Sequence, residues 1–218
     1  MFIGHFAVGL AAKPAAPGVS LAVLFAAALL ADILWPVLVI FGIEQVRIAP
    51  GITTVVPLDF ISYPYSHSLL LLVIWGLAMG WLFGRGDQRA ILVIAALVVS
   101  HWILDFVTHR PDMPVYPGGP KLGLELWRSV WLTMIAEIPM FLVGAWLYMK
   151  TTRPTQAVGR WSLLLMLTTL LMIYIGDMAS PEPPPSVEAM TAVAIGGSVL
   201  FIAWSGWTDR YRSRINTP

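Results

Sequence analysis

Six long apolar runs limit the folds open to this chain more than any other feature of its sequence. About 20 helical residues cross a hydrocarbon core roughly 30 Å thick. Six runs reach or approach that length: Val19–Ile43, Ser68–Phe83, Arg89–Thr108, Trp127–Met149, Gly159–Gly176 and Val187–Gly206. The chain is 58% hydrophobic and only 11% charged, which leaves little surface suited to water. The pattern predicts an all-α integral membrane protein, a single polytopic domain over residues 1–218 with a bundle of about six transmembrane helices.

The segment before the first run, Met1–Ala12, is apolar and compatible with a helix but too short to cross a membrane. Pro14, Pro17 and Gly18 separate it from the first run. We therefore expect a short N-terminal helix that is re-entrant or interfacial. The first run continues too far past Asp32 for a cleavable signal peptide, so we expect it to be retained as a span.

The lysines and arginines are distributed unevenly between the two sides of this bundle. With six spans, nine of them fall on the side of both termini, and four fall on the other side: Arg47, Arg110, Lys121 and Arg128. The positive-inside rule then predicts that both termini are cytoplasmic. A net charge of +1 without a long basic cluster argues against nucleic acid as a partner, and the lipid bilayer is the expected one. For the charges of the loop before the fourth run, exposed salt bridges are favoured over recognition of an anionic substrate group.

Three polar side chains recur every four residues in SHWILDFVTHR, at the end of the third run. His101, Asp105 and His109 therefore share one face of a helix. Imidazole and carboxylate groups at this spacing can bind one divalent cation, as the two histidines of H-E-x-x-H do. An ionisable side chain inside an apolar span costs roughly 2.5–3.5 kcal/mol, which favours a function for His101 and Asp105. His109 lies at the helix end, where contact with headgroups and water explains it equally well.

Other ionisable residues are candidates for the same site. Asp32 lies inside the first run, four residues before Pro36, and needs a partner such as a metal or a histidine from another helix. We expect Pro36 to end or tilt this helix and so to bring Asp32 toward His101 and Asp105. His67 begins the second run, where a headgroup-level histidine is the alternative. His5 is alone on an apolar segment, and such a histidine is more often structural than a ligand.

Glu137 is the remaining carboxylate inside a span, two residues before Pro139. It is a candidate catalytic base, as is Asp32 if that residue does not bind metal; a carboxylic acid kept neutral by burial is the alternative for Glu137. The chain has no cysteine, so any metal must be bound by His, Asp or Glu. Zinc is the expected divalent metal, with manganese or iron as alternatives. We expect the metal site within residues 1–137, and scaffold helices and a cytoplasmic tail within residues 159–218.

Four motifs occur in a characteristic order over roughly the first 130 residues: GHFAVGL, AD followed by Pro36, S-H-S at 66–68, and SHWILDFVTH. Together they resemble the YdjM-like proteins, a family of membrane-bound metal-dependent hydrolases of the bacterial inner membrane. Carried over residue by residue, the resemblance implies a ligand set of His5, Asp32, His67, His101 and Asp105. It also implies a location in the bacterial inner membrane.

The chain departs from the family pattern at two motifs. Leu34 and Trp35 stand where the family has a second aspartate and a histidine, and Ser62, Tyr63 and Pro64 stand where its H-R-G-x-T-H-S segment begins. One metal rather than two is therefore expected. The expected function is hydrolysis of an ester or phosphoester of a lipid or envelope component by a metal-activated water. The alternatives are an ion or proton transporter or channel that uses the same residues, and a membrane scaffold whose site is vestigial.

Overall fold

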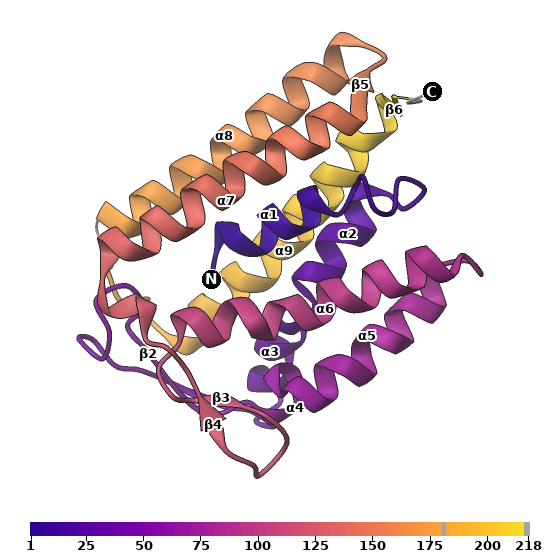
Figure 1. Ribbon diagram of the computed structural model, residues 1–218. Coiled ribbons are helices and arrows are strands. Elements are labelled where there is room, and N and C mark those ends of the chain that lie inside the picture. The colour runs from indigo at the N-terminus through magenta and orange to yellow at the C-terminus, as the bar shows by residue number, and fades with distance from the viewer. Residues whose placement is uncertain (180–181, 216–218) are drawn as a thin grey trace.

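The computed structural model describes residues 1–179 and 182–215, and helices dominate it (Figure 1). The helices are α1 (Ile3–Ala11), α2 (Leu21–Ala28), α3 (Leu30–Ile40), α4 (Pro64–His67), α5 (Leu69–Phe83), α6 (Gln88–Thr108), α7 (Val130–Thr151), α8 (Ala157–Ala179) and α9 (Val187–Arg210). Short antiparallel strand pairs connect them: β1 (Gln45–Ile48) with β2 (Leu58–Ser62), β3 (Met113–Pro114) with β4 (Lys121–Leu122), and β5 (Thr152–Pro154) with β6 (Arg212–Arg214). A 3₁₀ turn, η1 (Leu126–Arg128), precedes α7.

Within the described ranges, four helices, α6 to α9, are long and apolar enough to cross a membrane. This supports the predicted class of all-α membrane protein. The bent pair α2 and α3 would add a fifth span. Helix α5 forms in the expected place, but its 15 residues extend only about 22 Å, which is short of a hydrocarbon core. Six transmembrane helices are therefore not confirmed.

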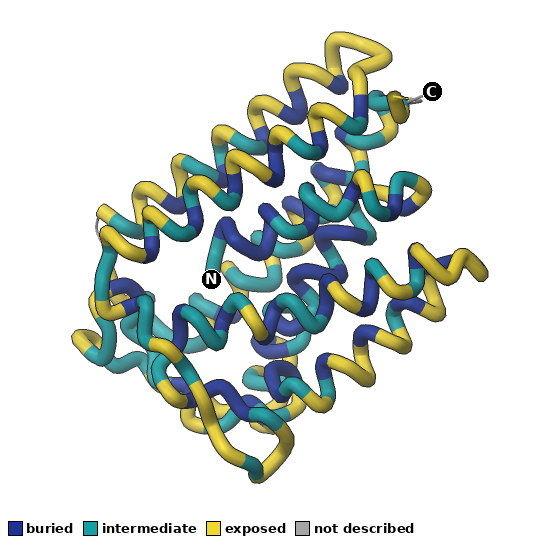
Figure 2. The backbone as a smooth tube through the Cα atoms, in the orientation of Figure 1, coloured by how far each residue is buried: buried dark blue, intermediate teal, exposed yellow. Residues whose placement is uncertain are grey.

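Helix α1 lies inside the bundle rather than at its surface. Seven of its nine residues are buried, and Figure 2 shows it among the darkest parts of the chain. It packs against α7 and also contacts α2 and α6. The chain then returns along α2, so that both His5 and the Ala28 carbonyl contact His101 on α6. Its burial among other helices argues against an interfacial placement, while a re-entrant course stays a prediction.

The first long apolar run is bent by 56° between α2 and α3, at Leu29. The break expected at Pro36 is wrong, because Pro36 lies inside α3, which continues to Ile40. Proline commonly kinks a helix, but the alanines and leucines around Leu29 carry no such signal. The bend places Asp32 in the first turn of α3, where the positive end of the helix dipole favours a carboxylate.

One end of the bundle collects the loops expected on the side of the termini together with strand β6, but not Met1, whose amino group is buried beside Asp105. The Nζ atom of Lys13 lies 2.8 Å from Oδ2 of Asp209 at the end of α9, and both side chains are largely buried. Strands β5 and β6 pair at the same end (Figure 1). Residues 83–85 and 87 share a small cavity with residues 18–20. These contacts agree with the expected arrangement of the loops, while the side of the membrane on which they lie stays a prediction.

The opposite end is closed by the strand pairs β1/β2 and β3/β4 and by η1 (Figure 1). The long segment after α3 folds as a hairpin in which Arg47 on β1 lies opposite Asp59 on β2. The backbone N–H groups of Thr54 and Val55 donate to the Trp127 carbonyl, which ties the hairpin loop to η1. The residues expected to form the functional site lie between this end and the middle of the bundle.

Candidate metal centre

Five of the predicted ligands meet in one cluster, although they come from four helices. His5 lies on α1, Asp32 on α3, His67 at the end of α4, and His101 and Asp105 lie one turn apart on α6. Asp32 keeps a side-chain exposure of 38%, and the other four residues are at most 3% exposed. We call these five residues the His/Asp cluster.

The His/Asp cluster contains two overlapping groups of three donors. Donor atoms of His5, His101 and Asp105 lie within 4.8 Å of one another, as do those of Asp32, His67 and His101. Because His101 belongs to both groups, the five side chains surround one region of the protein. Buried imidazole and carboxylate groups at these distances could hold a metal ion.

The hydrogen bonds of His101 fix which of its ring nitrogens carries a proton. Nδ1 lies 2.8 Å from the Ala28 carbonyl oxygen, which can only accept, so Nδ1–H is the donor. In the neutral ring, Nε2 then carries a lone pair. Nε2 is buried without a hydrogen-bond partner among the described residues, and it lies 3.1 Å from Asp105 and 3.6 Å from Asp32. A lone pair thus faces two carboxylates, an arrangement that a bound cation would stabilise.

His67 is held in the same way by a relay that begins at Glu44. The Ser66 hydroxyl donates to Oε2 of Glu44 at 2.6 Å, so Ser66 Oγ accepts from Nδ1–H of His67 at 2.7 Å. Nε2 of His67 is left facing Oδ1 of Asp32 at 3.7 Å. Glu44 and Ser66 were not predicted as site residues. A glutamate more than 20 residues from the histidine that it orients leaves no local pattern in the sequence.

Histidine nitrogens surround the carboxylate of Asp105. Oδ1 lies 3.1 Å from Nε2 of His5, whose ring stacks on His101 with centroids 3.8 Å apart. Oδ2 faces Nε2 of His101, His109 and His67 at 3.1, 3.7 and 3.9 Å. Because histidine nitrogens lie around both oxygens of its carboxylate, Asp105 is the centre of the His/Asp cluster.

His109 lies at the edge of the His/Asp cluster rather than in either group of three donors. Its Nδ1 lies 3.0 Å from Oδ1 of Asp112, and that oxygen also accepts from the Tyr63 hydroxyl at 2.9 Å. His109 is 3% exposed. The alternative in which it contacts water and headgroups is therefore wrong, while its role as a ligand stays a prediction. Asp112 and Tyr63, neither of which was predicted as a site residue, position it.

Glu137 takes part in a different set of contacts. Its Oε2 atom accepts hydrogen bonds from the backbone N–H groups of Phe2 and Gly4, both at 2.9 Å. It therefore holds the beginning of α1, the helix that carries His5. The amino group of Met1, in the same region, contacts Asp105.

A charged rim lies beyond His109 and Asp112. Arg110 donates to Asp59 at 2.8 Å and to Asp112 at 3.4 Å, and Arg47 donates to Asp59 at 2.6 Å. Burial alone would raise the pKa of Asp59, but the hydrogen bonds from Arg47 and Arg110 outweigh it and hold the pKa below its usual value. The rim is thus connected to the His/Asp cluster through Asp112 and His109.

Comparison with models of known protein families, with curated proteins and with solved structures finds no match to this chain.

Proposed function

We propose that this chain is a membrane-embedded, metal-dependent hydrolase that cleaves an ester or phosphoester of a lipid or envelope component. The observation that carries the proposal is the orientation of two histidine rings, each of which is held by a hydrogen bond at Nδ1. Nδ1 of His101 and of His67 is bound by a carbonyl and a hydroxyl, so both Nε2 atoms turn their lone pairs toward aspartates. In the neutral rings, nitrogen lone pairs therefore face carboxylates in a buried site, and a divalent cation between them would be bound by both.

Zinc is the proposed metal, because mixed imidazole and carboxylate ligation suits it, with manganese or iron as alternatives. His67, His101 and Asp105 are the proposed ligands, with His5 and His109 next to them. A bound divalent metal would make a water molecule nucleophilic at neutral pH. Asp32 is the most exposed member of the cluster, which suits it to accept a proton from that water. Glu137 is proposed to position α1, because its hydrogen bonds are to the backbone of that helix.

The polar contacts argue against the alternative of an ion or proton pathway. From Asp105 they continue through His109 and Asp112 to the charged rim at one end. Toward the other end, the described residues of α1 and α2 that follow His5 and precede Ala28 are apolar. A pathway across the membrane would need polar groups or water on both sides of the cluster. A site that is reached from one end is what a hydrolase requires.

Metal analysis of the purified protein tests the proposal. The wild type, supplied with zinc and then dialysed, should retain about one ion per chain, since the cluster offers donors for a single centre. His101→Ala and Asp105→Asn should lose it, whereas Glu188→Gln, an exposed carboxylate on α9, should not. Retention of the wild-type stoichiometry by both cluster variants would overturn the metal site. If the wild type binds metal but releases no product from a membrane lipid extract, the hydrolase proposal fails and a transporter or scaffold remains.

A further inference from the structure

The ring of His109 is held by a carboxylate outside the His/Asp cluster. Nδ1 of His109 lies 3.0 Å from Oδ1 of Asp112, and because an ionised carboxylate only accepts, Nδ1 carries the proton. The Tyr63 hydroxyl donates to the same oxygen at 2.9 Å, and Arg110 donates to Oδ2 at 3.4 Å. Nε2 of His109 is left with its lone pair, 3.7 Å from Oδ2 of Asp105.

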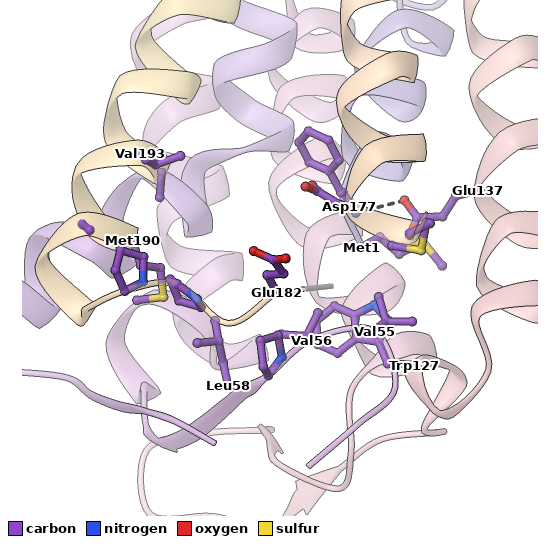
Figure 3. A pocket seen from close by; sticks show the side chains of 17 residues that line it. Met1, Val55, Val56, Leu58, Trp127, Glu137, Asp177, Glu182, Met190 and Val193 are labelled. Carbon is purple, nitrogen blue, oxygen red and sulfur yellow. Dashed lines mark hydrogen bonds between the residues drawn. The ribbon is translucent and has the colours of Figure 1, made fainter. Parts of the chain in front are cut away.

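Two aromatic side chains fix the plane of this imidazole. The ring of Trp127 lies 4.2 Å from it and the ring of Phe60 4.9 Å, measured between centroids. Trp127 also lines the mainly apolar cavity of about 600 Å³ drawn in Figure 3, which His109 does not line. A rotation of the buried imidazole would displace both aromatic rings from their packing. Nε2 of His109 is therefore kept pointing toward the cluster.

His109 is thus the third histidine with this orientation. In His67, His101 and His109, Nδ1 donates to a fixed oxygen, so the Nε2 lone pair faces inward. The three Nε2 atoms lie 3.9, 3.1 and 3.7 Å from one oxygen, Oδ2 of Asp105. Two ligands of one zinc ion lie at most about 4.2 Å apart, twice the usual distance of about 2.1 Å from zinc to a ligand. All three separations are below that limit, so each histidine can share an ion with Asp105.

The remaining histidine, His5, is oriented in the opposite way. Its Nε2 lies 3.1 Å from Oδ1 of Asp105, and its Nδ1 is buried without a hydrogen-bond partner among the described residues. Because the carboxylate only accepts, Nε2 carries the proton and the lone pair lies on Nδ1. Proximity alone would place His5 before His109, since His5 belongs to one of the groups of three donors. The hydrogen bonds instead give His5 the part of a donor that orients Asp105.

We infer that His109 is the third histidine ligand of the metal centre and that Asp112 is its positioning residue, whereas His5 orients Asp105 without binding the ion. The inference rests on the proposed function for the presence of a metal. His67, His101, His109 and Asp105 then supply four protein donors. Water has a place beside them in an ion with five or six ligands, as in five-coordinate zinc and in manganese or iron sites.

A cavity of about 480 Å³ lies next to this histidine, at the same end of the bundle. Asp112 and Phe60, which both contact the His109 ring, line it. So do all four basic residues assigned to this end: Arg47, Arg110, Lys121 and Arg128. A small molecule supplied in solution can therefore come next to the position of the His109 side chain, which allows the role of that side chain to be tested by chemical rescue.

The first test measures zinc affinity by competition with a chelator. Asp112→Ala should weaken zinc binding about 10- to 100-fold, and Asp112→Asn, which keeps an acceptor oxygen, should weaken it less. The matched control is Asp59→Ala. Asp59 pairs with Arg47 and Arg110 at the same end of the bundle and makes no hydrogen bond to a histidine among the described residues. This control should bind zinc as the wild type does.

Chemical rescue and a count of ligands separate a metal ligand from a structural residue. His109→Gly should lose zinc affinity, and imidazole in solution should restore it by filling the space of the deleted ring. 1-Methylimidazole should restore it less, because its methylated nitrogen cannot donate to Asp112. With saturating zinc, X-ray absorption at the zinc edge should count three imidazole ligands in the wild type and in His5→Gln, and two in His109→Gly.

Three outcomes would overturn the inference. In the first, Asp112→Ala binds zinc as tightly as the wild type. In the second, Asp59→Ala weakens zinc binding as much as Asp112→Ala does. In the third, the number of imidazole ligands falls in His5→Gln but not in His109→Gly. Each of them leaves the proposed function standing, because the wild type still binds metal, whereas a wild type that binds no zinc, manganese or iron refutes the proposed function and this inference with it.

Discussion

The carboxylate of Glu44 accepts a hydrogen bond from the Ser66 hydroxyl at 2.6 Å. This bond determines which ring nitrogen of His67 carries the proton, although Glu44 makes no hydrogen bond to His67 itself. Since the single hydroxyl proton of Ser66 is directed to Glu44, Ser66 can only accept from His67. Glu44 also accepts the backbone N–H groups of Tyr65 and Ser66 at 2.7 and 2.9 Å. It therefore fixes both the position of α4 and the ring nitrogen that His67 offers to a metal.

The first prediction is that Ser66→Ala weakens metal binding by about 10- to 100-fold, the range found when a group that orients a metal ligand is removed. This variant interrupts the relay but keeps the backbone hydrogen bonds of Glu44, so the fold should be retained. Zinc affinity is measured by competition with a chelator. Ser68→Ala is the matched control, because that hydroxyl caps α5 by accepting from the Leu71 N–H and, among the described residues, makes no hydrogen bond to a side chain of the His/Asp cluster. Equal zinc affinities for Ser66→Ala and the wild type would exclude the relay.

The second prediction concerns the close packing of α7 on α1. A Cβ atom at Gly144 would collide with the carbonyl of Ala7, two residues after His5 on α1. Gly144→Ala should therefore lower the free energy of unfolding by about 1–3 kcal/mol, the usual cost of overpacking, and should weaken zinc binding through His5. Gly176→Ala on α8 is the control, because its added methyl meets no atom within 4 Å. Thermal unfolding in detergent compares the two, and equal stabilities would contradict the packing argument.

The third prediction is a pH dependence of the rim. The pKa of Asp59 is lowered in the folded protein, so its pairs with Arg47 and Arg110 stabilise the fold above the unfolded pKa of about 4. This stabilisation is lost as the pH falls through the lower folded pKa. The difference in Tm between wild type and Asp59→Asn should therefore be largest near neutral pH and should shrink toward pH 3. A difference that grows on acidification would show that the shift has the opposite sign.

The helical class and the candidacy of His101, Asp105 and Asp32 were accessible from the sequence because they depend on local periodicity and on burial cost, whereas the full ligand set with His5 and His67 was implied by the family resemblance. His101 and Asp105 recur at helical spacing inside an apolar run, and Asp32 has no partner nearby in sequence. The structure places these residues together, within 3.1 Å for His101 and Asp105 and 3.6 Å for His101 and Asp32. Whether they bind a metal is what the proposed experiments decide.

Other features depend on contacts that no local pattern records. The bend at Leu29 forms in a stretch of good helix formers, whereas Pro36, the expected cause of a break, lies within a helix. The burial of α1 depends on Gly144, more than 130 residues later in the chain. The hydrogen bonds of Glu137 to α1 likewise join residues distant in sequence. From the sequence, this role in holding α1 could not be distinguished from the role of a catalytic base.

The last prediction is that the end of the bundle with Lys13 and Asp209 faces the cytoplasm. The structure joins at that end the segments that carry nine of the 13 lysines and arginines, through the pair of Lys13 with Asp209 and the pairing of β5 with β6. The remaining four line the cavity at the opposite end. Lysine and arginine are retained on the cytoplasmic side during insertion, so the charged rim should face outward.

Reporter fusions measure this orientation directly. Alkaline phosphatase is active only outside the cytoplasm, and a fluorescent protein of the green type folds poorly there when exported unfolded. A phosphatase fused after Pro218 should be inactive and the fluorescent protein bright, whereas phosphatase inserted after Gly118, in the turn between β3 and β4, should be active. Strand β6, the last described element before the first fusion, and the turn between β3 and β4 lie at opposite ends of the bundle, so each fusion is the control for the other. An active phosphatase after Pro218 together with an inactive one after Gly118 would invert the topology and make the cytoplasm the compartment from which lipid reaches the His/Asp cluster.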